Sequence, residues 1–258
     1  MINVIRLSKP VKLQQNGHSW TQELCTKRKA YYQELEKYEQ KERPTKPDFP
    51  KAKNARYAHK DIKQTLKRMF GAKCAYCESQ VTTVSYQHVE HFRPQSIYPR
   101  LAYDWDNLLL ACEVCNSGYK AARFPLSDGR QPAPDEKEPC LLDDSDENAL
   151  INPCFDDPEE FFDFSEDGRI ICRNKRAEYT RDVCGLDREA LNDARELWAE
   201  IIEIMAKAFL AANEAGRIEE KNRYGTTLKK CFATQYSALV RAKLKTLNID
   251  ETMFNIEI

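Results

Sequence analysis

Two CxxC pairs constrain this sequence more than any other feature. Cys74 and Cys77 form the first pair, Cys112 and Cys115 form the second, and 34 residues lie between the pairs. Such spacing matches a closed tetrahedral zinc site, in which zinc bonds sulfur at about 2.3 Å. A redox CxxC would open a helix after a strand in a βαβ unit, a pattern that is not evident here. We therefore predict a structural Zn²⁺ on these four cysteines, with redox or plain buried thiols as the alternative.

The remaining cysteines are scattered singly along the chain. They are Cys25, Cys140, Cys154, Cys172, Cys184 and Cys231. The sequence shows no signal-peptide core and no apolar run near the roughly 20 residues of a membrane-spanning helix, so we expect a cytoplasmic protein without membrane contact. Because that compartment is reducing, we predict that these six residues are reduced, mostly packed thiols.

The charge of the chain is divided unevenly. Residues 1–125 hold 22 Lys and Arg against 12 Asp and Glu, whereas residues 126–258 hold 18 against 29, so a net charge of −1 conceals a basic and an acidic half. A basic half favours contact with a polyanion, although such asymmetry also arises by chance. An apolar share of 41% and a charged share of 31% are typical of a soluble globular chain.

Apolar periodicity predicts a mainly helical α+β fold. Helices are expected over residues 21–41, 55–70, 187–215 and 226–247, with a strand over 82–91 and a short buried run at 108–111. Gly71 is placed to end the second helix, and the proline-rich stretch near 42–53 predicts an extended loop. We expect a basic helical region at 1–70, a zinc-stabilised module at 71–125, and an acidic irregular segment followed by helices at 126–258.

The residues between the cysteine pairs carry a second pattern. They contain HVEHFRPQS and YDWDNLLLA, and the second pair runs into CNSGYK. This arrangement resembles the HNH nuclease family, whose members fold it as a ββα-metal module that holds one divalent ion. The resemblance implies that His91 is the catalytic histidine, Asn107 the asparagine that braces the loop, and Asn116 a metal ligand. Glu90 stands where most members carry Asp, which leaves open whether it binds metal directly, through water, or orients the histidine.

The chemistry of phosphodiester hydrolysis agrees with this resemblance. The reaction needs an activated water and a cation that neutralises charge on the phosphoryl oxygens. An unperturbed imidazole can be neutral at working pH, so His91 is the predicted general base. Glu90 and Asn116 offer the oxygen ligands that Mg²⁺ or Mn²⁺ prefers. His88 is a rival metal ligand or a supporting group, or simply a histidine on the strand surface.

Three cations flank the predicted site. We expect Arg93, Lys120 and Arg123 to contact phosphates, although a solvated surface cation is the plain alternative for each. Trp105 is expected to be a core anchor and not a platform for base stacking.

The likeness extends beyond the motif. MINVIRLSKP, VEHFRPQSIYPRLAYDWDNLLLACEVCN, INPCFDDPEEFFDF and YTRDVCGLDREALNDAR resemble the PtuB family, the nuclease subunits of Septu and retron-associated anti-phage systems. That resemblance implies an endonuclease acting on DNA, or on RNA, beside an ATPase subunit of the PtuA type. The alternatives are a zinc-stabilised nucleic-acid-binding module with a vestigial site, and a stand-alone restriction-type nuclease.

Overall fold

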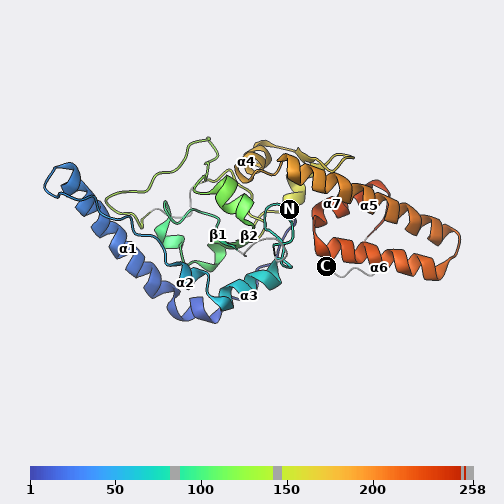
Figure 1. Cartoon of the computed structure of the whole chain (residues 1–258), viewed down its shortest axis with the longest axis horizontal. Coiled ribbons are helices and arrows are strands. Elements are labelled where there is room, and N and C mark those ends of the chain that lie inside the picture. The colour runs from blue at the N-terminus through green and yellow to red at the C-terminus, as the bar shows by residue number, and fades with distance from the viewer. Residues whose placement is uncertain (82–87, 142–146, 251–252, 254–258) are drawn as a thin grey trace.

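The computed structural model describes residues 1–81, 88–141, 147–250 and 253. Figure 1 shows an elongated, mainly helical chain whose two small sheets lie between the long helix α1 and the helices α5 and α6. The predicted α+β class, mainly helical with a small embedded module, is confirmed. No helix within the described ranges is both long and apolar enough to cross a membrane.

A short hairpin forms the centre of the predicted module. Strand β1 (His88–His91) pairs antiparallel with β2 (Leu108–Ala111), and His91 lies opposite Leu108. All four residues of β2 are buried, which explains the uninterrupted apolar run in the sequence. A π-helical turn, η3 (Val114–Lys120), follows the hairpin and completes the ββ-helix order. Residues 82–87 of the predicted strand lie outside the described residues.

The N-terminal helices differ in extent from the predicted ones. Helix α1 covers Val11–Glu39, so it begins ten residues before the expected start. The second predicted helix is divided into α2 (Asn54–Tyr57) and α3 (Lys60–Met69), because His59 leaves the helix and its side chain accepts a hydrogen bond from the backbone N of Asp61. Gly71 follows α3 with φ +56°, in the left-handed conformation expected of it.

The C-terminal helices form a second packed unit. Helix α5 (Glu189–Glu214) agrees with the prediction, but the last predicted helix is two, α6 (Ile218–Thr234) and α7 (Ser237–Thr246). The break occurs where Tyr236 takes a left-handed φ of +50° and its side chain is buried. Apolar side chains of α5, α6 and α7 form a small hydrophobic cluster of their own, separate from the main core around the hairpin.

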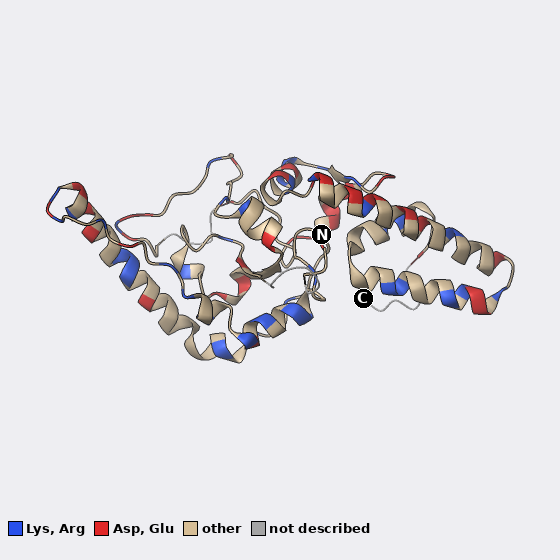
Figure 2. Ribbon diagram, in the orientation of Figure 1, with Lys and Arg blue, Asp and Glu red and all other residues tan. Residues whose placement is uncertain are grey.

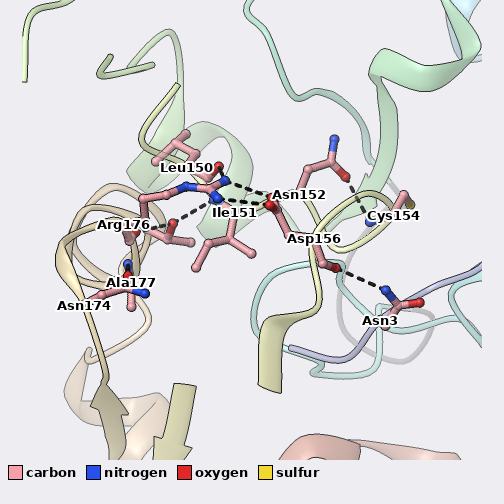
Figure 3. A network of polar contacts seen from close by, with 10 residues as sticks. Asn3, Leu150, Ile151, Asn152, Cys154, Asp156, Asn174, Arg176 and Ala177 are labelled. Carbon is pink, nitrogen blue, oxygen red and sulfur yellow. Dashed lines mark hydrogen bonds and ion pairs between the residues drawn. The ribbon is translucent and has the colours of Figure 1, made fainter. Parts of the chain in front are cut away.

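The acidic segment after residue 125 is mostly irregular, as predicted, but part of it lies in the core. It contains the single turn η4 (Pro158–Glu160) and the hairpin of β3 (Phe162–Phe164) with β4 (Ile170–Cys172), which leads into α4 (Lys175–Cys184). Arg176 of α4 donates a hydrogen bond to each carboxylate oxygen of Asp156, both at 3.0 Å (Figure 3). Asn3 donates to the backbone carbonyl of Asp156 at 3.1 Å. This segment is therefore fixed both to α4 and to the N-terminal segment that contains Asn3.

One prediction about the cysteines is wrong. Cys25 of α1 and Cys140 form a disulfide with a Cα–Cα separation of 5.9 Å, whereas Cys154, Cys172, Cys184 and Cys231 are free thiols as expected. Tertiary contact between α1 and the acidic segment brings the two sulfurs together, and Lys29 pairs with Glu138 beside them at 2.6 Å. The division of the chain at residues 70 and 125 stays a prediction, because the main core draws on residues from all three parts.

Candidate metal centre and nuclease cleft

The four cysteines of the two CxxC pairs converge on one point. Their sulfur atoms all lie within 4.8 Å of one another, and Cys77 Sγ is 3.8 Å from Cys112 Sγ. A tetrahedral zinc with bonds of about 2.3 Å requires sulfur atoms about 3.8 Å apart, so the cluster fits the ion. Cys74, Cys77 and Cys115 are almost completely buried. A zinc here would have no open coordination position and would serve as scaffold.

Neighbouring groups act on the four thiols in opposite directions: hydrogen bonds with the other cysteines lower the pKa of Cys77 and Cys112, burial raises that of Cys74, and a hydrogen bond with Cys112 raises that of Cys115. A hydrogen bond with Cys112 is the main cause that holds the pKa of Cys77 well below its usual value, and Cys77 Sγ also donates to the Ser79 hydroxyl oxygen at 3.3 Å. Arg188 Nη1 lies 3.6 Å from Cys115 Sγ, and the backbone N of Cys115 donates to Cys112 Sγ. Donors of this kind stabilise the negative charge of a four-thiolate zinc complex.

The helical segment η3, which carries Cys115 of the second cysteine pair, is fixed against α4. Gly185 ends α4 with φ +61°, and a Cβ at this position would lie 2.3 Å from the Tyr119 ring of η3. Only glycine permits both the left-handed backbone and this close approach. The contact positions η3, and therefore Asn116, relative to the hairpin.

His91 is buried and held by its Nε2 atom. Nε2 lies 2.9 Å from the carbonyl oxygen of Ala102, and the Tyr57 ring packs edge-on against the imidazole at 4.6 Å between centroids. Because a carbonyl only accepts, Nε2 carries the proton and Nδ1 keeps its lone pair. Burial lowers the pKa of His91 to about 4, against a smaller opposing effect of the Ala102 hydrogen bond. The ring is therefore neutral near pH 7.

Asn107 binds the loop between the two strands from inside. Its Oδ1 accepts from the backbone N of Arg93 at 2.7 Å, and its Nδ2 donates to the carbonyls of Arg93 at 3.0 Å and Leu101 at 3.1 Å. All three bonds are buried, so the side chain fixes both ends of the segment that carries Ala102. These contacts are compatible with the bracing role expected of Asn107, which stays a prediction.

Arg6, which is far away in the sequence, binds the turn at residues 105–108 that follows this loop. Arg6 donates to the carbonyls of Trp105 at 2.7 Å, Leu108 at 2.8 Å and Asp106 at 2.8 Å. The Trp105 ring is buried as expected, and its Nε1 donates to the Leu7 carbonyl at 2.9 Å. The N-terminal segment is therefore part of the support for the site, a role that no pattern in the sequence assigned to Arg6.

Glu90 lies in a buried ion pair. Its Oε1 is 2.6 Å from Lys120 Nζ and accepts a hydrogen bond from the Tyr76 hydroxyl at 3.3 Å. Lys120 is completely buried and also donates to the His91 carbonyl at 3.1 Å. Since Lys120 belongs to η3, its ammonium connects both the carboxylate and strand β1 to η3. Sequence reasoning did not identify this pair, because a lysine inside an apolar core has no local signature.

The predicted phosphate contacts need correction. Lys120 is enclosed in the core and neutralised by Glu90, so it does not face a phosphate. Arg93 is also buried, with its guanidinium over the rings of Tyr98 and Phe124 at 5.3 and 5.0 Å. Arg123 is exposed but donates to the carbonyl of Val183 at 3.0 Å. The first two cations support the fold, and a phosphate contact remains a proposal for Arg123 alone.

An open cleft of about 850 Å³ collects the remaining predicted site residues. His88, Glu90, His91 and Asn116 all line it. β1 ends at His91, and this end of the strand allows neighbouring positions to reach one cleft. Tyr57, from outside the motif, and Gln95, from within it, also line the cleft. Gln95 Oε1 accepts a hydrogen bond from the backbone N of Ala52 at 2.6 Å. This bond joins the proline-rich loop before α2 to the module.

Comparison with known proteins agrees with this geometry. Residues 74–121 match the family model described as HNH endonuclease. A Septu protein PtuB from Bacillus mycoides (strain KBAB4) is 36% identical over 165 residues, which cover 57% of this chain and 54% of that protein. The chain thus spans about half the length of that relative.

Two further relatives belong to the same system. A Septu protein PtuB from Bacillus thuringiensis is 29% identical over 221 residues and 76% of each chain. A Septu protein PtuA from the Bacillus mycoides strain is 30% identical over 147 residues, which cover 52% of this chain and 20% of that protein. Residues 74–121 thus match the HNH endonuclease family model, in a chain that is similar over most of its length to a Septu protein PtuB.

Proposed function

We propose that this chain is a metal-dependent endonuclease that hydrolyses phosphodiester bonds in DNA, or in RNA, with His91 as general base. The observation that carries the proposal is the fixed tautomer of His91. The Ala102 carbonyl holds the proton on Nε2, and Nδ1 is left to accept a proton from the attacking water. Since burial keeps the ring neutral, this lone pair is available at neutral pH.

The surroundings of His91 serve orientation. Asn107 holds both ends of the loop that presents the Ala102 carbonyl, and Tyr57 packs against the ring. A base fixed in one orientation accepts the proton of a water in line with the scissile bond, which removes much of the entropic part of the barrier. When the proton moves to Nδ1, the Ala102 carbonyl stabilises the resulting imidazolium.

The residues of the cleft fit a second metal ion, of the Mg²⁺ or Mn²⁺ type, separately from the zinc centre. Among the described residues only the four cysteines form a group of three or more classical ligands. The cleft offers the Asn116 amide oxygen, the His88 ring and Glu90. Lys120 and Tyr76 occupy Oε1 of Glu90, which leaves Oε2 as the oxygen for a direct or water-mediated contact. Bound there, the ion would neutralise charge on the phosphoryl oxygens.

The activity is tested with purified zinc-loaded protein on labelled DNA and RNA. Cleavage is expected with Mg²⁺ or Mn²⁺ and not with Ca²⁺ alone. The His91→Ala variant should lose at least 100-fold in rate while keeping its zinc content, because the proton acceptor is removed and the four cysteines are untouched. Its unfolding midpoint should fall modestly, because the buried ring and its hydrogen bond to the Ala102 carbonyl are lost as well. An inactive wild type across metals and substrates, with tight nucleic-acid binding retained, would instead identify a binding module.

We further propose that the chain acts in an anti-phage defence complex beside an ATPase subunit of the PtuA type. Its similarity to Septu proteins PtuB, and the similar stretch within a Septu protein PtuA, support this assignment. Co-expression with the product of the neighbouring gene tests it. Co-purification of the two chains is expected, and a strictly separate elution would favour the stand-alone nuclease.

A further inference from the structure

The cleft beside His91 has a wall of positive charge that comes from outside the HNH motif. Arg28 of α1, Lys51 of the proline-rich loop and Lys63 of α3 line it. Glu90 is the one carboxylate in this lining, and Lys120 neutralises it. Figure 2 shows several Lys and Arg positions, in blue, along the ribbon of α3. The cleft therefore carries a net positive charge toward solvent.

The three cations differ in what they already bind. Arg28 is 1% exposed, donates to the carbonyls of Ser96 and Gln95 at 3.0 and 3.1 Å, and lies 3.6 Å from the centroid of Phe49. It is a structural residue that holds the loop to α1. Lys51 and Lys63, in contrast, have no ion pair among the residues that the structure describes.

Two nearby cations are neutralised. Lys53 and Arg56 both bind Glu23 of α1, at 3.2 and 2.5 Å, and so do not add to the charge of the cleft. Among the described cations that line the cleft, Lys51 and Lys63 differ from Arg28 because their ammonium groups have neither a carboxylate nor a backbone carbonyl as partner. Cations held at a cleft without an acidic neighbour keep their charge for a bound anion.

The backbone under both lysines is held in place. The residues after Lys51 are fixed by the hydrogen bond from Ala52 N to Gln95 and by that from Lys53 N to the Tyr103 hydroxyl at 2.8 Å. Lys63 follows Ile62, which is completely buried, and its own backbone N donates to the His59 carbonyl at 3.0 Å. Each ammonium therefore extends on a flexible side chain from a fixed point of the wall.

We propose that Lys51 and Lys63 bind backbone phosphates of a nucleic-acid strand and guide it past His91, the role that sequence reasoning gave to Arg93 and Lys120. This inference rests on the proposed nuclease function and adds the residues that hold its substrate. Contacts of this kind are made to phosphate and carry no base preference.

The test measures binding separately from cleavage. In the His91→Ala background with Ca²⁺, fluorescence anisotropy follows a labelled 30-base-pair DNA duplex, a DNA single strand and an RNA single strand across KCl concentrations. Removal of one phosphate contact lowers the slope of log K against log salt by about 0.9 for duplex and about 0.7 for a single strand. For duplex this corresponds to about eightfold weaker binding at 0.1 M KCl for each lysine.

Lys51→Ala and Lys63→Ala are each expected to show that loss, and the double variant should lose about 60-fold at 0.1 M KCl. Lys67→Ala is the matched control, since Lys67 is exposed on the same helix and does not line the cleft. Equal losses in all three single variants would overturn the proposal, as would an unchanged salt slope or no binding to any of the probes. If binding depends on Lys51 and Lys63 but the wild-type protein cleaves no substrate, the proposed nuclease activity is refuted, whereas the assignment of these two lysines to phosphate binding is retained.

Discussion

Replacement of Lys120 by Met should destabilise the protein far more than an ordinary lysine substitution. The Lys120 side chain is 0% exposed and that of Glu90 is 4% exposed, and their N and O atoms are 2.6 Å apart. Methionine fills a similar volume without charge, so Lys120→Met leaves the Glu90 carboxylate inside the core without its cation.

The expected loss follows from these contacts. Removal of one partner of a buried ion pair costs about 3–5 kcal/mol, because the remaining charge stays desolvated. The lost hydrogen bond to the His91 carbonyl adds about 1 kcal/mol. The double variant Glu90→Gln/Lys120→Met removes both charges and should lose less than half as much as Lys120→Met, because no uncompensated ion remains.

Urea unfolding of the zinc-loaded proteins, followed by tryptophan fluorescence, gives these free energies from the midpoint and slope. Zinc content measured in parallel checks that the four-cysteine centre is intact. Two results would refute the assignment of Glu90 as the partner of a buried ammonium. One is a loss of unfolding free energy below 1 kcal/mol for Lys120→Met. The other is a loss in the double variant equal to the sum of the losses in Lys120→Met and in Glu90→Gln.

Other expected outcomes concern the loop, the zinc centre and the disulfide. Asn107→Ala should lower the free energy of unfolding by about 3 kcal/mol, because three buried backbone groups lose their hydrogen-bond partners. The variant should also cleave more slowly while it retains zinc. Wild-type kinetics and stability would contradict the bracing role. Cys112→Ser should release zinc and unfold the module, so a soluble, fully active zinc-free variant would exclude a structural metal. Thiol titration of the unfolded, metal-free chain should find eight free thiols before reduction and ten after it. Cys140→Ser should destabilise the protein by up to about 5 kcal/mol, because the disulfide joins residues that are 115 positions apart in the sequence. Ten free thiols before reduction would show that Cys25 and Cys140 are not bonded in solution.

Local sequence was sufficient wherever the chemistry lies in a short segment. The paired CxxC spacing predicted the cluster of four sulfurs, because each pair occupies one turn and only two turns must meet. The apolar run at 108–111 predicted a buried segment, which is strand β2, and Gly71 predicted a helix end, since both depend on the residues themselves. The boundaries of α5 followed in the same way from periodicity, within two residues of expectation, whereas α1 begins ten residues before its predicted start.

Tertiary structure decided what each charged side chain does. From the sequence, Lys120 and Arg93 are indistinguishable from surface cations, but the fold buries both and leaves Lys51 and Lys63 facing the cleft. Burial and partner choice depend on elements far apart along the chain, and no local pattern encodes them.

The same reason explains the other differences. Arg6 reaches a turn about 100 residues away, and Cys25 reaches Cys140 across 115 residues. By itself, the sequence determined the two cysteine turns, the residue types of an HNH site and the order of its elements. Only the tertiary structure determined which nitrogen of His91 keeps its proton and which cations remain for a substrate, because these properties arise from contacts between segments that the chain brings together on folding.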